Sequence, residues 1–528
     1  MSGRQGVACG APHPALAAGH LARAVLATAA GALVLAGCAT PGAGRPGASH
    51  PGAAVAPSTS APSTTTTTTT PAQALLPVRP IVWSPCGTGL QCGTVTVPLD
   101  YAQPLGPSIA VAVARHPAED PAARIGSVVI NPGGPGASGI NDLYNELGAL
   151  SGDVLARFDV VSFDPRGVGQ SAPVNCGEGA AGSPAQLPDP TPTDAASQTA
   201  LLDNDTTYAA ACKTASGYEL GWVGTVDTAM DLDRIRAAIG DAQLTFIGHS
   251  YGTLLGETYA ELYPTHVRAM VLDGVIDPSI SMVQMASDQA VGFENVLDDF
   301  FAWCASTGCS WRPAGDPTSA LLALIATSRA HMLPGYGGRG AGPGEFYDAL
   351  LDTLYARSSW PTLAGALAQA QAGNGAAILS LSDGYTAHGT PNLADANAAV
   401  NCLDHPSPSD PSAYPAMAAA AAAQAPVFGP LLIWGILGCG VWQEPATRLP
   451  HVITAAGTPP ILVVGTTKDP ATPYAWAQHV ASMLAGGVLV TRVGEDHVAE
   501  FYSACVRAIV GAYLVAGTTP ADGTTCSS

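Results

Sequence analysis

The feature that most constrains this chain is a serine set between glycines, in the pentapeptide Gly248-His249-Ser250-Tyr251-Gly252. An apolar run, residues 244–247, precedes it, and a segment rich in Ala, Leu and Tyr follows it as far as Tyr263. The pattern predicts a strand, a sharp turn and a helix, with Ser250 in the turn. Glycines are needed beside so tight a turn because larger side chains would clash with the neighbouring backbone. The serine hydroxyl would then lie at a helix N-terminus, where the helix dipole stabilises negative charge.

Gly-x-Ser-x-Gly also occurs by chance, so the interpretation depends on the strand and helix around it. In that context the motif predicts the nucleophile elbow of an α/β-hydrolase. Further apolar runs predict strands at residues 94–97, 109–114, 127–130, 158–163, 268–272, 461–464 and 488–493. We therefore expect an α/β fold of the α/β-hydrolase type, with a mostly parallel eight-stranded sheet and a helical lid inserted after the sixth strand.

The expected organisation has five parts. These are a signal peptide (1–37), a tether (38–76), the first part of the hydrolase core (77–278), the helical lid (279–458) and the C-terminal part of the core (459–528). In the core, residues 225–239 predict a helix with charged side chains, including Asp231, Arg234 and Arg236, turned outward. Arg166, in the loop after the strand at 158–163, is expected to brace loops rather than take part in the chemistry.

The last two predicted strands are each followed by a residue type that serine catalysis needs. Asp469 follows the first and His497 follows the second, so the order is Ser250, Asp469, His497, as in α/β-hydrolases. A neutral imidazole takes the serine proton, and the carboxylate holds the imidazole in the correct tautomer. Asp273 is a second candidate for the acid, although we favour a structural role for it. We expect Asp496 to be badly placed to reach His497, and His249 to pack in the interior.

The strand at residues 127–130 leads into a glycine-rich loop, Asn131-Pro132-Gly133-Gly134-Pro135-Gly136. In α/β-hydrolases this loop donates one backbone N–H to the oxyanion hole, and the residue after the nucleophile donates the other. We therefore predict Gly134 and Tyr251 as the donors, with Gly133 as the next choice. A plain turn is the alternative for the glycine loop.

The N-terminus has the pattern of an export signal. Residues 1–37 contain Arg4 and Arg23, no acidic residue, and an apolar run that ends in Leu35-Ala36-Gly37-Cys38. This ending resembles the bacterial lipobox, which implies lipidation of Cys38; an ordinary signal peptide is the alternative. The following segment is rich in Pro, Gly, Ser and Thr and cannot bury enough apolar area to fold, so we expect a disordered tether to a membrane surface.

Without Cys9 and Cys38, ten cysteines remain, an even number that fits disulfides in an exported protein. Sequence neighbours suggest the pairs Cys86–Cys92, Cys176–Cys212, Cys304–Cys309, Cys402–Cys439 and Cys505–Cys526, although sequence alone does not determine connectivity. No pair has zinc-site spacing and no nucleotide-binding loop occurs, so we expect no metal and no cofactor. The net charge of −20 argues against nucleic acid as a partner and fits a soluble exported protein.

Taken together, these segments resemble the exported tripeptidyl aminopeptidases of actinobacteria, α/β-hydrolases related to prolyl aminopeptidase. The segments that carry the resemblance are 131–139, 163–171, 248–264, 399–404, 465–473 and His497. Asn131 stands where prolyl aminopeptidases have histidine, which favours the tripeptidyl branch. The resemblance implies a surface serine exopeptidase that acts on peptides with a free N-terminus.

For the substrate ammonium we expect a lid carboxylate, and Asp404 is the first candidate because a disulfide at Cys402 would hold it. Its alternative is an ordinary solvated loop acid. A carboxylesterase or lipase with the same triad is the main alternative function. A non-catalytic binding protein on a hydrolase scaffold is disfavoured by the intact Ser250, Asp469 and His497.

Overall fold

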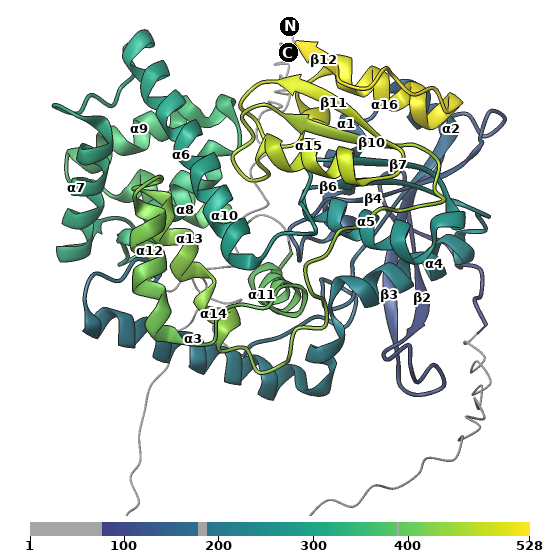
Figure 1. The fold of residues 1–528 in the computed structure, drawn as a ribbon, viewed down its shortest axis with the longest axis horizontal. Helices are drawn as coiled ribbons and strands as arrows, with labels where there is room; N and C mark the ends of the chain where they lie inside the picture. Colours follow the sequence, from purple (N-terminus) through teal and green to yellow (C-terminus); the bar gives the residue numbers. More distant parts are fainter. Residues whose placement is uncertain (1–76, 178–186, 388–389, 528) are drawn as a thin grey trace, which may run out of the picture.

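The computed structural model describes residues 77–177, 187–387 and 390–527. The predicted signal peptide, Cys38 and the tether lie outside the described residues. Within the described residues, two regions lie side by side: a twisted sheet covered by helices, on the right in Figure 1, and a group of helices on the left.

One large sheet forms the centre of the first region. Its strands are β1 (Ser84–Gly87), β2 (Leu90–Pro98), β3 (Ser108–His116), β4 (Gly126–Asn131), β5 (Phe158–Phe163), β6 (Leu244–His249), β7 (Val267–Asp273), β10 (Ile461–Thr466), β11 (Gly487–Val493) and β12 (Thr524–Ser527). Their spatial order is β1-β2-β3-β5-β4-β6-β7-β10-β11-β12. The pairs from β1 to β5 in this order are antiparallel, and all later pairs are parallel.

The described sheet has ten strands where we expected eight, because a short strand is added at each edge. Neither β1 nor β12 contains the apolar run by which a buried strand is recognised. A disulfide holds each of them instead, Cys86–Cys92 for β1 and Cys505–Cys526 for β12. The other predicted pairs also form disulfides, namely Cys176–Cys212, Cys304–Cys309 and Cys402–Cys439.

Helices cover both faces of the sheet. On one face α1 (Gly139–Ala149), α2 (Gly152–Arg157) and α16 (Ala504–Ala516) pack against residues such as Val128 and Ile247. On the other face α4 (Thr225–Ile239), α5 (Tyr251–Leu262) and α15 (Tyr474–Met483) pack against residues such as Val129 and Phe246. Consecutive strand residues therefore enter different cores, as the alternation of side chains in a strand requires.

The helix predicted at 225–239 forms as α4, but the expected outward orientation of its charges is wrong. Asp231 is fully buried, and Arg234 and Arg236 are nearly so. The carboxylate of Asp231 accepts hydrogen bonds of 2.7 Å from Nε and Nη2 of Arg166, whose side chain is itself fully buried. Arg166 also donates to backbone carbonyls of the loops at Leu99 and Trp222. A buried charge that is paired in this way does not need the solvent.

We call the described residues between β7 and β10 the helical cap. Its helices are α6 (Met282–Thr307), α7 (Pro317–Ala330), α8 (Pro343–Leu354), α9 (Trp360–Gln371), α10 (Ala376–Ala387), α11 (Leu393–Asp404), α12 (Tyr414–Ala422), α13 (Phe428–Gly435) and α14 (Leu437–Gly440). A long helix that we did not predict, α3 (Ala195–Ser216), runs along the cap and packs against α14. It comes from the segment between β5 and β6, so the cap is completed by a second part of the chain.

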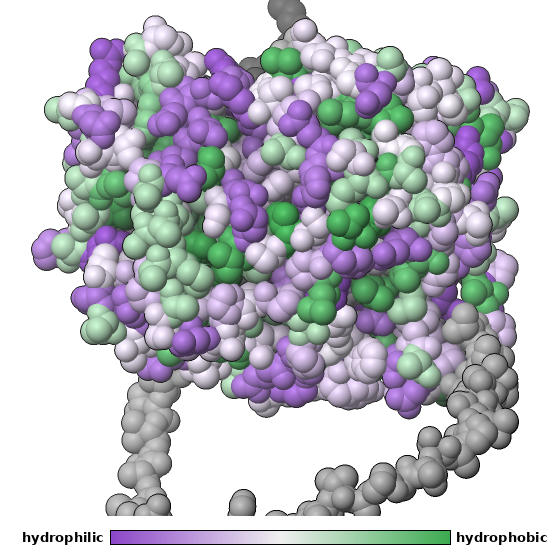
Figure 2. Space-filling model, in the orientation of Figure 1, coloured by the Kyte–Doolittle hydropathy of each residue, from purple (hydrophilic) through white to green (hydrophobic). Residues whose placement is uncertain are grey.

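The surface of the molecule is mixed in polarity. On the face shown in Figure 2, apolar residues occur in small groups between polar ones. Among the helices of the described residues, none combines the length and the apolar character needed to cross a bilayer.

Candidate active site

Ser250 occupies the turn between β6 and α5, with φ 55° and ψ −123°. A positive φ is strained for a residue with a Cβ and persists only where the surroundings impose it. The flanking glycines allow it. A Cβ on Gly248 would lie 2.3 Å from the carbonyl oxygen of Gly252, and a Cβ on Gly252 would lie 2.5 Å from that of Asn131. The Ser250 N–H donates to the carbonyl of Asp273 at 2.9 Å, which joins the turn to the end of β7.

Asp469 and His497 lie together at the ends of β10 and β11. His497 Nδ1 is 2.9 Å from each carboxylate oxygen of Asp469, and both residues are 3% exposed. The carboxylate is held by the N–H groups of Ala471 and Thr472, at 2.9 and 2.8 Å. His497 Nε2 is buried and has no hydrogen-bond partner among the described residues. This nitrogen is therefore available to accept a proton.

The same pair lies close to the nucleophile turn. A Cβ on Gly274, the residue after Asp273, would be 3.1 Å from Cε1 of His497. Two neighbours of His497 were not identified from the sequence. The ring of Tyr355, in the cap, packs edge-on to the imidazole, with 5.2 Å between the ring centres. The backbone carbonyl of Tyr355 accepts the backbone N–H of His497 at 3.0 Å. The hydroxyl of Thr472 lies 3.3 Å from Nδ1.

The competing acids have other partners. The carboxylate of Asp273 accepts the N–H groups of Ala499 and Glu500, at 3.0 and 2.8 Å. Asp496 accepts Nη2 of Arg492 at 2.6 Å and the N–H of Arg357 at 2.8 Å. Of the acids that we considered, Asp469 is thus the one whose carboxylate meets the imidazole of His497.

The glycine-rich loop after β4 lies against the turn. A Cβ on Gly133 would be 2.5 Å from the carbonyl oxygen of His249 and 2.9 Å from Cβ of Ser250. The Gly133 N–H already donates to Oδ1 of Asn131 at 3.1 Å. Gly134, with φ 108°, lines the same cavity as Ser250. Gly134 thus borders the cavity beside Ser250, whereas the N–H of Gly133 already has a partner.

A cavity of about 100 Å³ lies between Ser250 and the cap. Most of its cap wall is apolar, with Met282, Met285 and Phe293 from α6, Leu351 from α8, and Leu432 and Ile436 from the segment 428–442. Leu432 and Ile436 thus place that segment against the cavity. Its polar wall comes from Gln289 and from two asparagines of α11, Asn397 and Asn401. No carboxylate is among the residues that line it.

Asp404 does not line this cavity. It is 1% exposed, and its carboxylate accepts the N–H of Thr225 at 2.9 Å and the Thr225 hydroxyl, so that it caps α4. The same hydroxyl is bonded to the phenol of Tyr251. Burial raises the pKa of Asp404 to about 6, although the bonds from Thr225 oppose this. Asp404 thus supports the residue after the nucleophile, and an ammonium could reach it only by displacing Thr225.

The chain is similar in sequence to known hydrolases. A family described as "TAP-like protein" matches residues 425–526, and the "alpha/beta hydrolase fold" family matches residues 126–311. The chain is 36% identical to "Serine protease Hip1" of Mycobacterium tuberculosis over 85% of its own length and 91% of the relative's. It is 33% identical to "Tripeptidyl aminopeptidase" of Streptomyces lividans, over 85% and 86%. The chain belongs to the tripeptidyl aminopeptidase family of α/β-hydrolases.

A third relative widens the range of activities in this family. The chain is 34% identical to a protein named "Carboxylesterase B" from Mycobacterium tuberculosis, over 83% of its own length and 86% of the relative's. The family and the fold show that this chain is a serine hydrolase, as expected from its sequence. The five disulfides among the described residues are typical of an exported protein.

Proposed function

We propose that the protein is an exported serine exopeptidase that releases tripeptides from free N-termini through an acyl-enzyme. The observation that carries this proposal is the likeness, along most of the chain, to a tripeptidyl aminopeptidase and to a serine protease. The hydrogen-bonded pair of Asp469 and His497 near the Ser250 turn supports it.

In this proposal Ser250 Oγ attacks the peptide carbonyl while His497 Nε2 takes the hydroxyl proton. Asp469 accepts the hydrogen bond from Nδ1–H and stabilises the imidazolium. The N–H groups of Gly134 and Tyr251 stabilise the oxyanion. Collapse of the tetrahedral intermediate breaks the C–N bond, and the imidazolium gives its proton to the leaving amine. A water molecule then hydrolyses the ester by the same steps.

The cap favours cleavage near a chain end. Residues of the cap line the cavity together with Ser250, so the nucleophile is covered on one side. Such a covered site favours a free chain end over the middle of a long polypeptide. Asp404 stays our prediction for the group that binds the substrate ammonium. Its carboxylate already accepts hydrogen bonds from Thr225, which an ammonium would have to replace. Asn397 and Asn401 line the cavity itself and are a second choice.

A carboxylesterase is the second candidate, because the cavity wall is mostly apolar and contains no carboxylate, and because one relative carries that name. The deciding experiment compares a tripeptide amide with a free amine, its acetylated form and a short acyl ester. An exopeptidase should prefer the free amine by about 30- to 1000-fold in kcat/KM, since blocking it leaves a binding group unpaired. Equal cleavage of the two amides would remove the exopeptidase proposal, and faster ester turnover would favour the esterase.

The same substrates can locate the ammonium group. If Asp404 binds it, Asp404→Asn should erase the preference for the free amine while a fluorophosphonate still labels Ser250. If the asparagines bind it, Asn401→Ala should do so and Asp404→Asn should not.

We further propose that Cys38 is lipidated and anchors the enzyme to the cell surface. The support is the sequence Leu35-Ala36-Gly37-Cys38, followed by a segment rich in Pro, Ser and Thr. Cys38→Ser should release the protein into the medium or block its maturation. Wild-type protein recovered from cells without lipid would contradict the anchor.

A further inference from the structure

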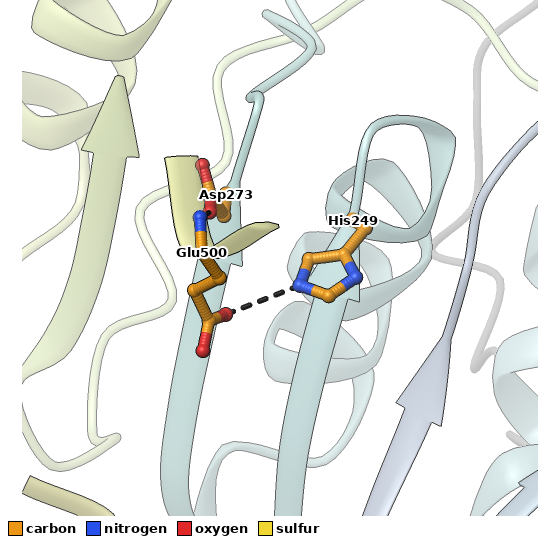
Figure 3. A group of neighbouring side chains, drawn as sticks. All are labelled: His249, Asp273 and Glu500. Atoms are coloured by element: carbon orange, nitrogen blue, oxygen red, sulfur yellow. Dashed lines mark hydrogen bonds and ion pairs between the residues drawn. The ribbon is translucent and has the colours of Figure 1, made fainter. Parts of the chain in front are cut away.

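His249, the residue before Ser250, lies in a fully buried cluster of charges on the side of β6 away from the cavity. Its Nδ1 is 3.0 Å from Oε2 of Glu146 in α1. Its Nε2 is 3.1 Å from Oε2 of Glu500 in the short helix η5 (Ala499–Phe501). All three side chains are at most 1% exposed, and the ring of Phe501 covers the imidazole at 5.3 Å. Figure 3 shows the contact with Glu500, with Asp273 beside it.

Both ring nitrogens of this histidine lie at hydrogen-bond distance from a carboxylate. A neutral imidazole has one N–H and one lone pair, but both nitrogens of His249 face carboxylate oxygens. When both carboxylates are ionised, only the imidazolium donates to both. Burial lowers the pKa of His249, but Glu146 and Glu500 outweigh this effect and hold it well above the usual value. Two further titratable groups face the cluster. Asp273 interacts with both His249 and Glu500, and Arg507 donates to the backbone carbonyl of Glu500.

A metal site is the alternative for this cluster. His249, Asp273 and Glu500 offer ligand atoms that lie within 4.8 Å of one another. A metal needs a lone pair on the histidine nitrogen. Because both nitrogens point at carboxylates at hydrogen-bond distance, the geometry favours an ion-paired imidazolium.

The cluster ties together two strained parts of the active site. Ser250 has φ 55°, and Val498, directly after His497, has φ 64°, which is unfavourable for a β-branched residue. The carbonyl of Asp273 holds the Ser250 N–H, and its carboxylate holds the N–H groups of Ala499 and Glu500. The side chain of Glu500 contacts His249, with Oε2 at 3.1 Å from Nε2. The nucleophile turn and the loop of the base are therefore joined twice, once through Asp273 and once through the His249–Glu500 pair.

We propose that the Glu146–His249–Glu500 bridge is a positioning device that fixes the His497 loop relative to Ser250. His249 and Glu500 touch neither the cavity nor the reacting atoms, so they are positioning residues. The inference rests on the proposed triad. Because a misplacement of about 1 Å costs on the order of 100-fold in rate, loss of the bridge should lower kcat and leave substrate binding in the cap unchanged.

The test uses His249→Gln and Glu500→Gln in the full-length enzyme, with His451→Gln as the matched control. His451 pairs with Glu261 on the surface, so its loss should leave kcat and KM unchanged. Both cluster variants should lower kcat about 30- to 100-fold, with KM within about threefold. The double variant should lose no more than the worse single variant, because the two residues act as one unit. Rates are expressed per active site titrated with a fluorophosphonate, so that misfolded protein does not count.

A purely structural bridge would lower the unfolding temperature and leave kcat per titrated site within about twofold of wild type, which would overturn the proposal. If His249→Gln fails to fold, Glu500→Gln retains the shape of the side chain and answers the same question. In the wild type, ¹⁵N-histidine NMR should show one histidine with two slowly exchanging ring N–H protons that Glu500→Gln perturbs. A single N–H on that ring would contradict the imidazolium. Labelling that persists in Ser250→Ala would instead show that the triad is wrong.

Discussion

Two histidines near Ser250 differ in their carboxylate partners. His497 has one carboxylate, Asp469 on Nδ1, and its Nε2 has no partner among the described residues. His249 has two, Glu146 on Nδ1 and Glu500 on Nε2. Both imidazoles are 1% exposed, so burial does not separate their roles. The number of carboxylate partners separates them. An imidazole with a partner on one nitrogen can accept a proton at the other nitrogen, whereas an imidazole with partners on both nitrogens cannot.

The largest expected effect is that of removing Ser250, the residue that we expect His497 to deprotonate. Ser250→Ala should lower turnover by on the order of 10⁴-fold or more, because the other residues of the triad have no nucleophile to activate. A fluorophosphonate should label the wild type at this position and leave the variant unlabelled. Near-normal turnover would mean that neither histidine has the role assigned to it.

The next prediction compares the acids of the two histidine clusters. Asp469→Asn should cost roughly 10⁴ in kcat, because an amide favours the wrong tautomer of His497. Asp273→Asn retains one acceptor for the N–H groups of residues 499 and 500, and we expect a loss of about 10- to 100-fold. Steady-state kinetics on the two variants decide the order. A larger loss in Asp273→Asn would transfer the role of the acid to β7.

The smallest expected effect concerns a buried carboxylate that is held by backbone groups. Glu294 in α6 accepts the N–H groups of Val427 and Phe428, and burial raises its pKa to about 7. Its usual value is near 4.5, so the folded state binds the extra proton. The stability from this group is complete below about pH 4.5 and is lost as the pH rises through about 7.

Glu294→Gln is neutral at every pH and should remove this contribution. Between pH 5 and 8 the Tm of the wild type should fall more than that of the variant, by about 1–3 °C. Parallel Tm curves in differential scanning calorimetry would show that Glu294 is ionised throughout. Glu294, which is held by backbone amides, would then be ionised in the same way as a carboxylate that is paired with an imidazole.

Much of the parallel sheet could be predicted from the sequence. β5 has the predicted bounds, since most of its residues are apolar, as expected for a strand that is buried along its whole length. The edge strands β1 and β12 and the helix α3 could not, because short exposed strands and a helix without a clear apolar face lack such a signal. Asp231 was expected to face solvent for a related reason. Its partner Arg166 lies 65 residues away, and no local pattern shows that contact.

The sequence by itself determined the nucleophile turn, because a Cβ on Gly248 would clash with Gly252, only four residues further along the chain. It also determined the order of Ser250, Asp469 and His497, which follows from the order of the strands. Only the tertiary structure decided which carboxylate meets His497, that Asp404 caps α4, and that His249 lies between two glutamates. These contacts join side chains from different strands and helices, and their distances depend on how the whole sheet and its cap are packed.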